Sequence, residues 1–353
     1  MSQSMTFWRE KSVLVAGGAG MIGAHVARAL LEEGAEVCVA DNLSSGSLRN
    51  IEDIRDSVLL EIADLRDAAS CLRLTEGKDY VFQFAANMGG IGWITAIGAD
   101  IMRDSALINI NMLEAATRNQ VKRFFFSSSA CIYPTGLQVS AEVVPLKEED
   151  AMPADPNEFY GWEKLASEKL CEAYHKDYGL EVRIGRFHNI FGEAYTAFDQ
   201  LKGKAPAHLV MKALRYPDKP FVVWRDGKQT RSFLYIDDCV QGVLKLVESD
   251  YTQPLNIGSD RLVSINEMIN ILRQISGKEI QVEYDLSKPQ GVRGRNADLT
   301  LVKKVLGWEP KVSLEEGLSR LYSWAGENLA DIQQLLASEP SYTHGLSGRV
   351  KLT

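Results

Sequence analysis

Residues 13–23 read Val-Leu-Val-Ala-Gly-Gly-Ala-Gly-Met-Ile-Gly, and this stretch decides the fold. Its apolar start predicts a buried strand that runs into a glycine turn with the spacing Gly-x-x-Gly-x-x-Gly. Glycines at this spacing let the backbone turn tightly, approach a pyrophosphate and pack a helix against the strand, while free N–H groups at the helix start face negative charge. A glycine-rich turn also occurs as a plain connection, so its meaning depends on the residues that follow. The candidate dinucleotide-binding residues of the turn are Gly17, Gly20, Met21, Ile22 and Gly23.

The residues after the turn alternate between strands and helices. Helical patterns at 21–33 and 96–119 alternate with apolar runs at 36–40, 59–63 and 80–85. This alternation predicts an α/β fold built on a doubly wound parallel sheet of the Rossmann type. The last of these runs is apolar almost throughout, which fits a sheet that is covered on both faces.

A chain of 353 residues is long enough for one large α/β domain or for two lobes. We predict a dinucleotide-binding domain over residues 1–182 and a smaller α/β substrate-binding lobe over 183–330, parts of which return to the sheet. Residues 331–353 form a C-terminal tail to which no role is assigned.

Asp41 ends the second predicted strand, about twenty residues beyond the glycine turn. A carboxylate at this place holds the ribose hydroxyls of an adenosine and repels a 2′-phosphate, so NAD is favoured over NADP. Capping of the loop is the alternative role for Asp41. Asp64, after the third strand, is a second candidate for contact with the adenosine, although a role in the turn explains it nearly as well.

The composition excludes several classes of protein. A formal net charge of −8 and a pI near 5.3 leave no broad basic surface for nucleic acid. The sequence contains neither an apolar stretch of about eighteen residues nor a secretory signal, so we expect no membrane contact and a cytoplasmic protein. The five cysteines are odd in number and include no Cys-x-x-Cys pair, so they predict neither disulfides nor a metal site.

Polar residues with catalytic potential follow the apolar run 124–126. Three serines come first, then Cys131, and further along the chain Tyr160-x-x-x-Lys164. A parallel sheet presents such a strand end to a ligand crevice. Residues i and i+4 share one helix face, so the Lys164 ammonium is expected to favour the phenolate form of Tyr160, whose reference pKa is near 10.

Together with the glycine turn, Asp41 and Asp64, these residues resemble the extended short-chain dehydrogenases/reductases over nearly the whole chain. The resemblance implies a bound NAD, with Tyr160 as the acid/base on a sugar hydroxyl. It also implies that Lys164 binds the nicotinamide ribose and lowers the pKa of Tyr160, and that Ser129 hydrogen-bonds the same sugar oxygen.

Further segments resemble a narrower family, the GDP-mannose 3,5-epimerases. They lie at residues 85–93 (AANMGGIGW), 128–134 (SSACIYP), 183–192 (RIGRFHNIFG), 204–206 (KAP), 229–233 (QTRSF), 256–259 (NIGS) and 291–296 (GVRGRN). The resemblance implies an NAD-dependent isomerase that inverts C3 and C5 of GDP-mannose through a transient 4-keto sugar, giving GDP-L-galactose and GDP-L-gulose. The NAD is then expected to stay tightly bound, because no net redox change occurs.

A ketone acidifies the hydrogens on its neighbouring carbons, and inversion needs proton-transfer groups on opposite faces of the sugar ring. The resemblance implies Cys131 as the base and Lys204 as the acid, whereas related 4-epimerases and dehydratases commonly carry threonine at the position of Cys131. Residues 193–199 depart from the usual glycine-rich run of the family, which leaves Lys202 open as the acid. The plain alternatives are a packing role for Cys131 and a solvated loop position for Lys204.

The second half of the chain offers residues for a nucleoside diphosphate sugar. The guanidinium groups of Arg231, Arg293 and Arg295 match phosphate oxygens, and two buried arginines in Arg-Gly-Arg would need a ligand or solvent. A surface position is the alternative for Lys212, whose role rests on the resemblance. The candidate substrate residues are Gly90, Ser129, Cys131, Asn189, Lys204, Ala205, Lys212, Gln229, Arg231, Arg293 and Arg295.

The resemblance also implies a homodimer, formed through the helices predicted at 96–119 and 159–178. An intramolecular face has the same apolar period, so the pattern alone does not decide between the two. The apolar residues concerned are Leu107, Ile110, Leu113, Ala116, Leu165, Leu170 and Tyr174.

A GDP-sugar is thus the expected partner, with neither nucleic acid nor membrane. Another nucleotide-sugar 4-epimerase or a 4,6-dehydratase, which shares Ser129, Tyr160 and Lys164 without a thiol base, is the alternative function. A non-catalytic NAD-sensing module is a third possibility, and the intact Ser-Tyr-Lys set argues against it.

Overall fold

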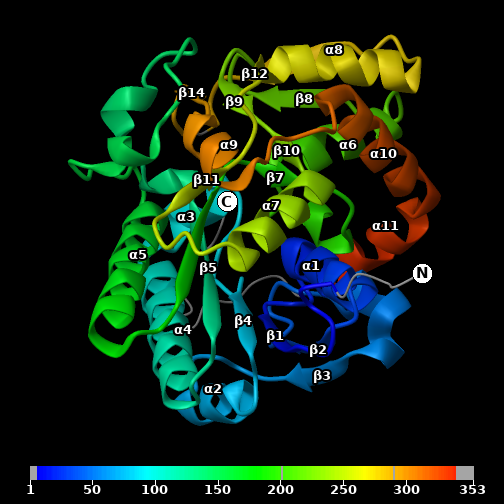
Figure 1. Cartoon of the computed structure of the whole chain (residues 1–353). Helices are drawn as coiled ribbons and strands as arrows, with labels where there is room; N and C mark the ends of the chain where they lie inside the picture. Colours follow the sequence, from blue (N-terminus) through cyan, green and yellow to red (C-terminus); the bar gives the residue numbers. More distant parts are fainter. Residues whose placement is uncertain (1–5, 200–201, 289–290, 339–353) are drawn as a thin grey trace.

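The computed structural model describes residues 6–199, 202–288 and 291–338. A seven-stranded sheet lies at its centre (Figure 1), and all neighbouring strands within it run parallel. The predicted α/β fold with a doubly wound parallel sheet is therefore confirmed. In spatial order the strands are β11 (Leu255–Ile257), β6 (Val182–Phe187), β5 (Arg123–Ser129), β4 (Tyr80–Gln83), β1 (Ser12–Ala16), β2 (Glu36–Asp41) and β3 (Leu59–Ile62).

The strand order reverses beside β1. From β1 the chain moves outward to β2 and β3, and it then returns to the other side of β1 to form β4, β5 and β6. The loops at the carboxyl ends of β1 and β4 therefore leave in opposite directions, and such a switch point opens a crevice for ligands.

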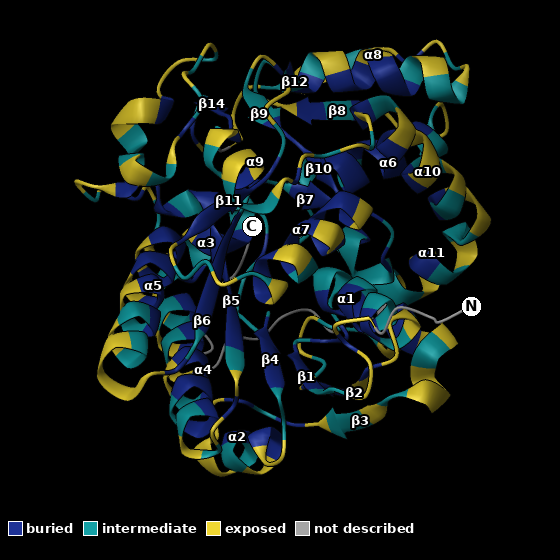
Figure 2. Ribbon diagram, in the orientation of Figure 1, coloured by how far each residue is buried: buried dark blue, intermediate teal, exposed yellow. Residues whose placement is uncertain are grey.

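Helices cover both faces of the sheet, and the strands alternate between them. Val13 and Val15 of β1 pack on the side of α1, whereas Leu14 and Ala16 pack in a separate core on the other side. Full burial of one such side chain stabilises the fold by about 1.5–3 kcal/mol. In Figure 2 the inner strands of the sheet are almost wholly buried, the edge strand β3 is partly exposed, and the outer helix faces carry exposed residues. The covering helices are α1 (Met21–Glu32) and α7 (Ile236–Glu248) on one face and α2 (Ala68–Thr75), α4 (Gly98–Arg118) and α5 (Phe159–Tyr178) on the other.

The helix predicted at 96–119 is interrupted near its start. Ala96 ends a separate short helix, α3 (Ile91–Ala96), and α4 begins at Gly98. Ile97 between them has φ −132° and ψ 40°, which lies outside the helical region. α3 packs with Tyr160 of α5 and with Cys131 in one hydrophobic cluster.

The second half of the chain both completes the sheet and builds a smaller lobe at one end of it (Figure 1). β6, α7 and β11 belong to the sheet layer, and the boundary predicted at residue 183 falls inside β6. The lobe contains the helices α6 (Ala205–Arg215), α8 (Ile265–Ser276), α9 (Thr300–Leu306) and α10 (Leu314–Glu327). Its strands pair as β8 (Phe221–Trp224) with β13 (Val282–Asp285), β7 (Ile190–Phe191) with β10 (Leu234–Tyr235), and β12 (Leu262–Ser264) with β9 (Thr230–Ser232) and β14 (Gly294–Arg295).

Part of the predicted tail is structured. Residues 331–338 complete helix α11 (Leu329–Ser338), in which Ile332 is fully buried, whereas residues 339–353 lie outside the described residues. Within the described ranges no helix is long and apolar enough to span a bilayer.

Candidate active site

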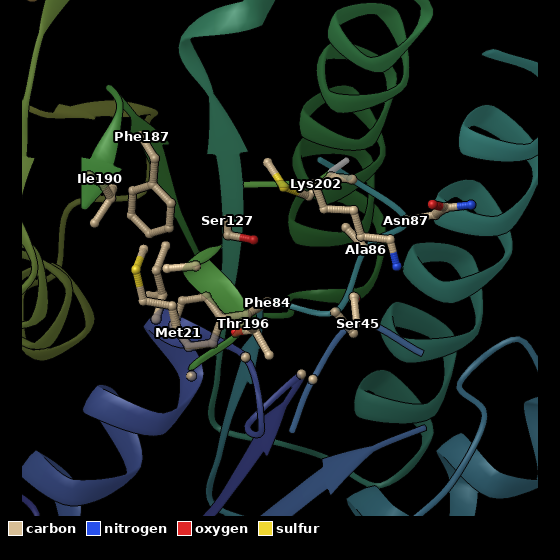
Figure 3. Close-up of a pocket in the computed structure, with 18 of the residues that line it drawn as sticks. Met21, Ser45, Phe84, Ala86, Asn87, Ser127, Phe187, Ile190, Thr196 and Lys202 are labelled. Carbon is tan, nitrogen blue, oxygen red and sulfur yellow. The ribbon is translucent and has the colours of Figure 1, made fainter. Parts of the chain in front are cut away.

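A pocket of about 380 Å³ lies at the carboxyl ends of the central strands, at the switch point. Figure 3 shows side chains from segments that are far apart in the sequence, such as Met21, Ser127 and Lys202, gathered around it. The lining includes ten residues that the sequence predicted: Gly17, Gly20, Met21, Ile22, Gly23, Asp41, Ser129, Tyr160, Lys164 and Lys204.

The glycine turn leaves one end of this pocket open to an anion. Gly17 has φ +75°, and a Cβ placed on it would lie 2.7 Å from the backbone nitrogen of Ala85. Gly20 caps α1 without a side-chain hydrogen bond, and the first turn of α1 holds no acidic residue. The N–H groups and the positive end of the helix dipole are thus available for a pyrophosphate.

Asp41 lies at the adenosine end that the fold implies. Its carboxylate accepts hydrogen bonds from the backbone N–H groups of Ala19 (3.1 Å) and Leu43 (2.8 Å). Burial raises the pKa of Asp41, and the two backbone hydrogen bonds oppose that rise. A Cβ on Gly46 would lie 2.8 Å from either carboxylate oxygen, so the loop fits closely around this group. These residues and the glycine turn fit a dinucleotide.

Asp64 does not lie in the pocket. Its carboxylate forms an ion pair with Arg66 and accepts the backbone N–H of Arg66 at 3.0 Å. These contacts, with the Arg66 side chain first, lower the pKa of Asp64. These contacts fit the alternative role of Asp64 in the turn. Its neighbours Leu65 and Arg66 line the pocket.

Tyr160 and Lys164 project from α5 beneath the end of β5. The Lys164 ammonium donates a hydrogen bond to the Ser127 carbonyl at 2.9 Å and lies 5.8 Å from the centre of the Tyr160 ring. Burial raises the pKa of Tyr160, and the nearby Cys131 raises it further. Burial also lowers the pKa of Lys164. Burial thus favours the protonated phenol of Tyr160, and the expected effect of the Lys164 ammonium on the phenolate stays a prediction.

Cys131 sits in η2 (Ala130–Ile132), directly after β5, and is partly exposed. Its backbone N–H donates to the Ser129 hydroxyl at 3.1 Å, and the Arg295 Nη1 donates to its Sγ at 3.2 Å. Burial raises the pKa of this thiol, but the charge of Arg295, the hydrogen bonds to Ser129 and Arg295 and the charge of Lys204 outweigh burial and lower it. The other four cysteines are buried, so Cys131 alone combines access with thiolate character.

The two candidate lysines occupy different places. Lys204 precedes α6 and interacts electrostatically with Cys131, and burial lowers the pKa of its ammonium. The Lys202 ammonium instead donates to the Ser44 carbonyl at 2.9 Å and lies 5.0 Å from the centre of the Trp93 ring. The geometry favours Lys204 as the proton-transfer partner of Cys131.

The predicted arginines do not act as one group. Arg295 and Arg231 are paired in register on β14 and β9, so their side chains share one face beside Cys131. Burial lowers the pKa of Arg231 to about 9, and its guanidinium donates to the carbonyls of Thr230 and Val292. Arg293 lies apart, in an ion pair with Asp226 at 2.9 Å.

The other candidate substrate residues are divided between the crevice and the lobe. Lys212 donates to the Val222 carbonyl at 2.6 Å, and Asn189, at φ 45°, donates to the Ser232 carbonyl at 2.9 Å. The Gln229 side-chain oxygen is buried and has no hydrogen-bond partner among the described residues. Gly90 precedes α3 as its N-cap and donates its N–H to the Lys202 carbonyl. Ala205 starts α6 between the pocket residues Lys204 and Pro206.

Sequence reasoning missed a group that closes the pocket. Asn50 accepts the Tyr195 N–H at 2.9 Å and donates to the Ala19 carbonyl at 2.8 Å and to the Thr196 hydroxyl at 3.0 Å. It joins the glycine turn to the segment 193–199, the one that departs from the family pattern. An asparagine in an irregular segment carries no sequence signal for such a contact. Among the described residues, no three side chains of His, Cys, Asp or Glu are grouped to hold a metal ion.

This chain matches the NAD dependent epimerase/dehydratase family over residues 13–258. It is 44% identical over 331 residues to GDP-mannose 3,5-epimerase of Arabidopsis thaliana, with 92% of this chain and 85% of the relative covered. The structure of UDP-glucose 4-epimerase from Thermotoga maritima with UDP-glucose matches with a TM-score of 0.82 at 30% identity, covering 90% of this chain and 99% of that one. A dTDP-glucose 4,6-dehydratase from Streptomyces venezuelae with NAD bound matches with a TM-score of 0.79 at 25% identity, covering 92% and 99%. The pocket geometry and these matches lead to one conclusion: the chain belongs to the NAD-dependent epimerase/dehydratase family.

Proposed function

We propose that this protein inverts C3 and C5 of GDP-mannose, giving GDP-L-galactose and GDP-L-gulose through a transient 4-keto sugar. The observation that carries the proposal is the Cys131 thiol, whose Sγ receives a hydrogen bond from Arg295 at 3.2 Å beside Tyr160 and Lys204. A family member that only moves hydride at C4 has no use for a second, thiolate base. The 44% identity to a GDP-mannose 3,5-epimerase over most of both chains supports the same reaction.

NAD fits the pocket described above, with the glycine turn at the pyrophosphate and Asp41 at the adenosine ribose. When bound, NAD supplies the reversible oxidation of the sugar at C4. Because the cycle involves no net redox change, the cofactor is expected to remain bound between turnovers.

Tyr160 is the group that takes the proton from the C4 hydroxyl and later returns it. Because burial raises its pKa, the tyrosine holds its proton firmly until substrate and cofactor change its surroundings. Ser129 donates a hydrogen bond to the same sugar oxygen and keeps it within reach. Lys164 is fixed by the Ser127 carbonyl and thereby orients the cofactor end of the site.

Cys131 and Lys204 then act on the carbons that flank the ketone. The lowered thiol pKa supplies a base that is ionised nearer neutrality than an ordinary cysteine, and the lowered pKa of Lys204 makes its ammonium a readier acid. The thiolate removes the proton from one face, and the ammonium delivers one to the other. Return of the C4 hydroxyl proton by Tyr160 completes the cycle with no net redox change.

A product assay tests this function. The purified protein, incubated in turn with GDP-mannose, UDP-glucose and dTDP-glucose, should convert only the first, and NMR of the sugars should show galacto and gulo products. Cys131→Ala should abolish these products, whereas Cys38→Ala, a matched change at a buried cysteine of β2, should retain them. Conversion of UDP-glucose to UDP-galactose, with GDP-mannose untouched, would instead identify a 4-epimerase.

The proposed enzyme is a homodimer that joins through α4 and α5, which lie side by side in Figure 1. Leu113, Ala116 and Leu165 are buried among residues of their own chain, as the intramolecular alternative expects. Leu107 and Ile110 remain 40% and 46% exposed, and they define the part of α4 that is open to a second copy.

A further inference from the structure

Gln138 joins the catalytic loop to the smaller lobe. It ends η3 (Thr135–Gln138) and is only 1% exposed. Its side-chain nitrogen donates to the carbonyls of Tyr133 (3.0 Å) and Pro134 (3.1 Å), just beyond Cys131. Its side-chain oxygen accepts the Nε–H of Arg295, and its backbone carbonyl accepts the Arg293 N–H at 2.9 Å. One buried amide thus connects the segment after Cys131 with β14.

This connection fixes the direction of the Arg295 guanidinium. The group is planar and its five N–H bonds point in fixed directions, so a hydrogen bond from Nε determines where Nη1 points. In this structure Nη1 points at the Cys131 Sγ, 3.2 Å away. Arg295 is itself only 8% exposed, so its position is set by these contacts and not by solvent.

We propose that Gln138 is a positioning residue: it orients Arg295 so that the guanidinium, and not a free counter-ion, stabilises the Cys131 thiolate. The consequence for turnover rests on the function proposed above. In this proposal Arg295 stabilises the Cys131 thiolate, whereas the sequence suggested that it binds the diphosphate.

Other charged and titratable groups also face Cys131. Lys204 at the start of α6 and Arg231 on β9 add positive charge, and Tyr160 on α5 is a neutral phenol. Among the described residues, Arg295 is the charged side chain that donates a hydrogen bond to the sulfur. Loss of its orientation therefore removes a direct contact, while the longer-range charges stay in place.

The test is a titration of the thiol in the NAD-loaded protein without sugar. The rate of iodoacetamide alkylation at Cys131 is followed across a range of pH, with the modified peptide identified by mass spectrometry and Cys131→Ser as the blank. Gln138→Leu should lower the alkylation rate at neutral pH by about tenfold and move its midpoint to higher pH, because the thiolate loses its oriented partner. Gln241→Leu, the same change at an exposed glutamine of α7, should leave the profile as in the wild type.

Two further variants keep the proposal falsifiable if Gln138→Leu does not fold. Arg295→Lys retains the charge but replaces the rigid guanidinium, with Nε on Gln138 and Nη1 on the sulfur, by a flexible ammonium, so it should shift the profile in the same direction. Where both single variants fold, the double variant should shift the profile no further than either alone, because both act through one contact.

Three results would overturn the proposal: a folded, NAD-binding Gln138→Leu with the wild-type alkylation profile, an unshifted Arg295→Lys, or additive shifts in the double variant. These outcomes are independent of the proposed reaction, because no sugar is present. Failure of the wild-type protein to act on GDP-mannose would refute the proposed function. The thiol titration would still test whether Gln138 positions Arg295.

Discussion

At the scale of single residues, the pKa shifts of Cys131 and Lys204 predict a bell-shaped dependence of rate on pH. The thiol must lose its proton, so kcat/KM should rise with pH through a pKa that Arg295, Ser129 and Lys204 hold below the ordinary cysteine value against burial. The ammonium must keep its proton, so the rate should fall above a pKa that burial holds below the ordinary lysine value. A pH profile with the rising limb at the ordinary cysteine pKa would contradict the role of Arg295.

The two lysines near the pocket should give different losses. Lys204→Met should reduce epimerisation by about 100-fold or more, because it removes the proton donor. Lys202→Met should leave the reaction intact at saturating NAD and raise the NAD concentration needed, because the Lys202 ammonium contacts the loop at Ser44. Steady-state kinetics of both variants over a range of NAD concentrations measures this, and the reverse pattern would make Lys202 the acid.

The sequence predicted a minority of the residues that line the crevice, and it did not predict their partners. The glycine turn, Asp41, Tyr160 and Lys164 could be found because their spacing along one strand or helix fixes their place. Arg293 and Arg295 could not be separated, since alternate residues of a strand share a face. In the structure β14 begins only at Gly294, so Arg293 lies outside the strand. Its side chain forms an ion pair with Asp226.

At the scale of elements, hydrogen bonds from several elements hold the segment 193–199 over the pocket. The Glu193 carbonyl contacts the His25 ring at 2.8 Å, Tyr195 donates its hydroxyl proton to Asn328 at 2.8 Å, and Asn50 holds both Tyr195 and Thr196. Thr196 and Ala197 line the pocket, so these contacts close it. The C-terminal helices α10 and α11 thereby support the cofactor site from outside the sheet.

Asn50→Ala should therefore speed the release of NAD. The substitution leaves the Tyr195 N–H without its partner, which costs about 1–3 kcal/mol, whereas the Ala19 carbonyl keeps its hydrogen bond from the Ser47 N–H. We expect NAD to dissociate at least about tenfold faster, as measured by the exchange of bound cofactor for a labelled one. Asn270→Ala, on the exposed side of α8, should exchange at the wild-type rate, and equal rates in both variants would show that Asn50 does not retain the cofactor.

The regular elements were predictable and the irregular ones were not. The helix expected at 159–178 has these bounds in the structure, and Gly179, at φ 73°, ends it. By contrast, η5 (Tyr195–Phe198) and the contacts of η3 depend on side chains from distant segments, such as Asn50 and Arg295. Local sequence patterns carry no information about such partners.

At the scale of the whole molecule, the exposed part of α4 predicts the oligomeric state. Ile110→Arg places a charge in the proposed dimer face and should convert the dimer to a monomer, because the charge would be buried without a partner. Light scattering after size-exclusion chromatography measures this. Leu59→Arg, at an exposed position on the edge strand β3, is the control that should stay dimeric. A wild-type protein that is already monomeric would refute the dimer.

Buried His188 predicts a loss of stability in acid. Burial lowers its pKa to about 3, and the ring bonds the Asn256 side chain at 2.9 Å. The unfolded chain binds a proton near pH 6.5 and the folded chain does not until about pH 3, so the free energy of unfolding falls as the pH drops through this window. From pH 7 to pH 5 this group contributes a loss of about 2 kcal/mol.

The variant His188→Phe removes this titration, while Asn256 keeps its hydrogen bond from the Tyr133 hydroxyl at 2.6 Å. Urea unfolding at both pH values should therefore show a smaller acid-induced loss in the variant than in the wild type. Equal losses would mean that His188 is not the group that titrates.

The central claim is that Cys131 removes a proton from the carbons beside a transient ketone. Proton NMR of GDP-mannose in deuterated water, followed with the wild-type protein and with Cys131→Ala, tests it most directly. The wild type should place deuterium at C3 and C5. The variant should place none, while the absorbance of the bound cofactor still shows that the substrate reduces it. Deuterium at C3 and C5 in the variant would show that another group is the base.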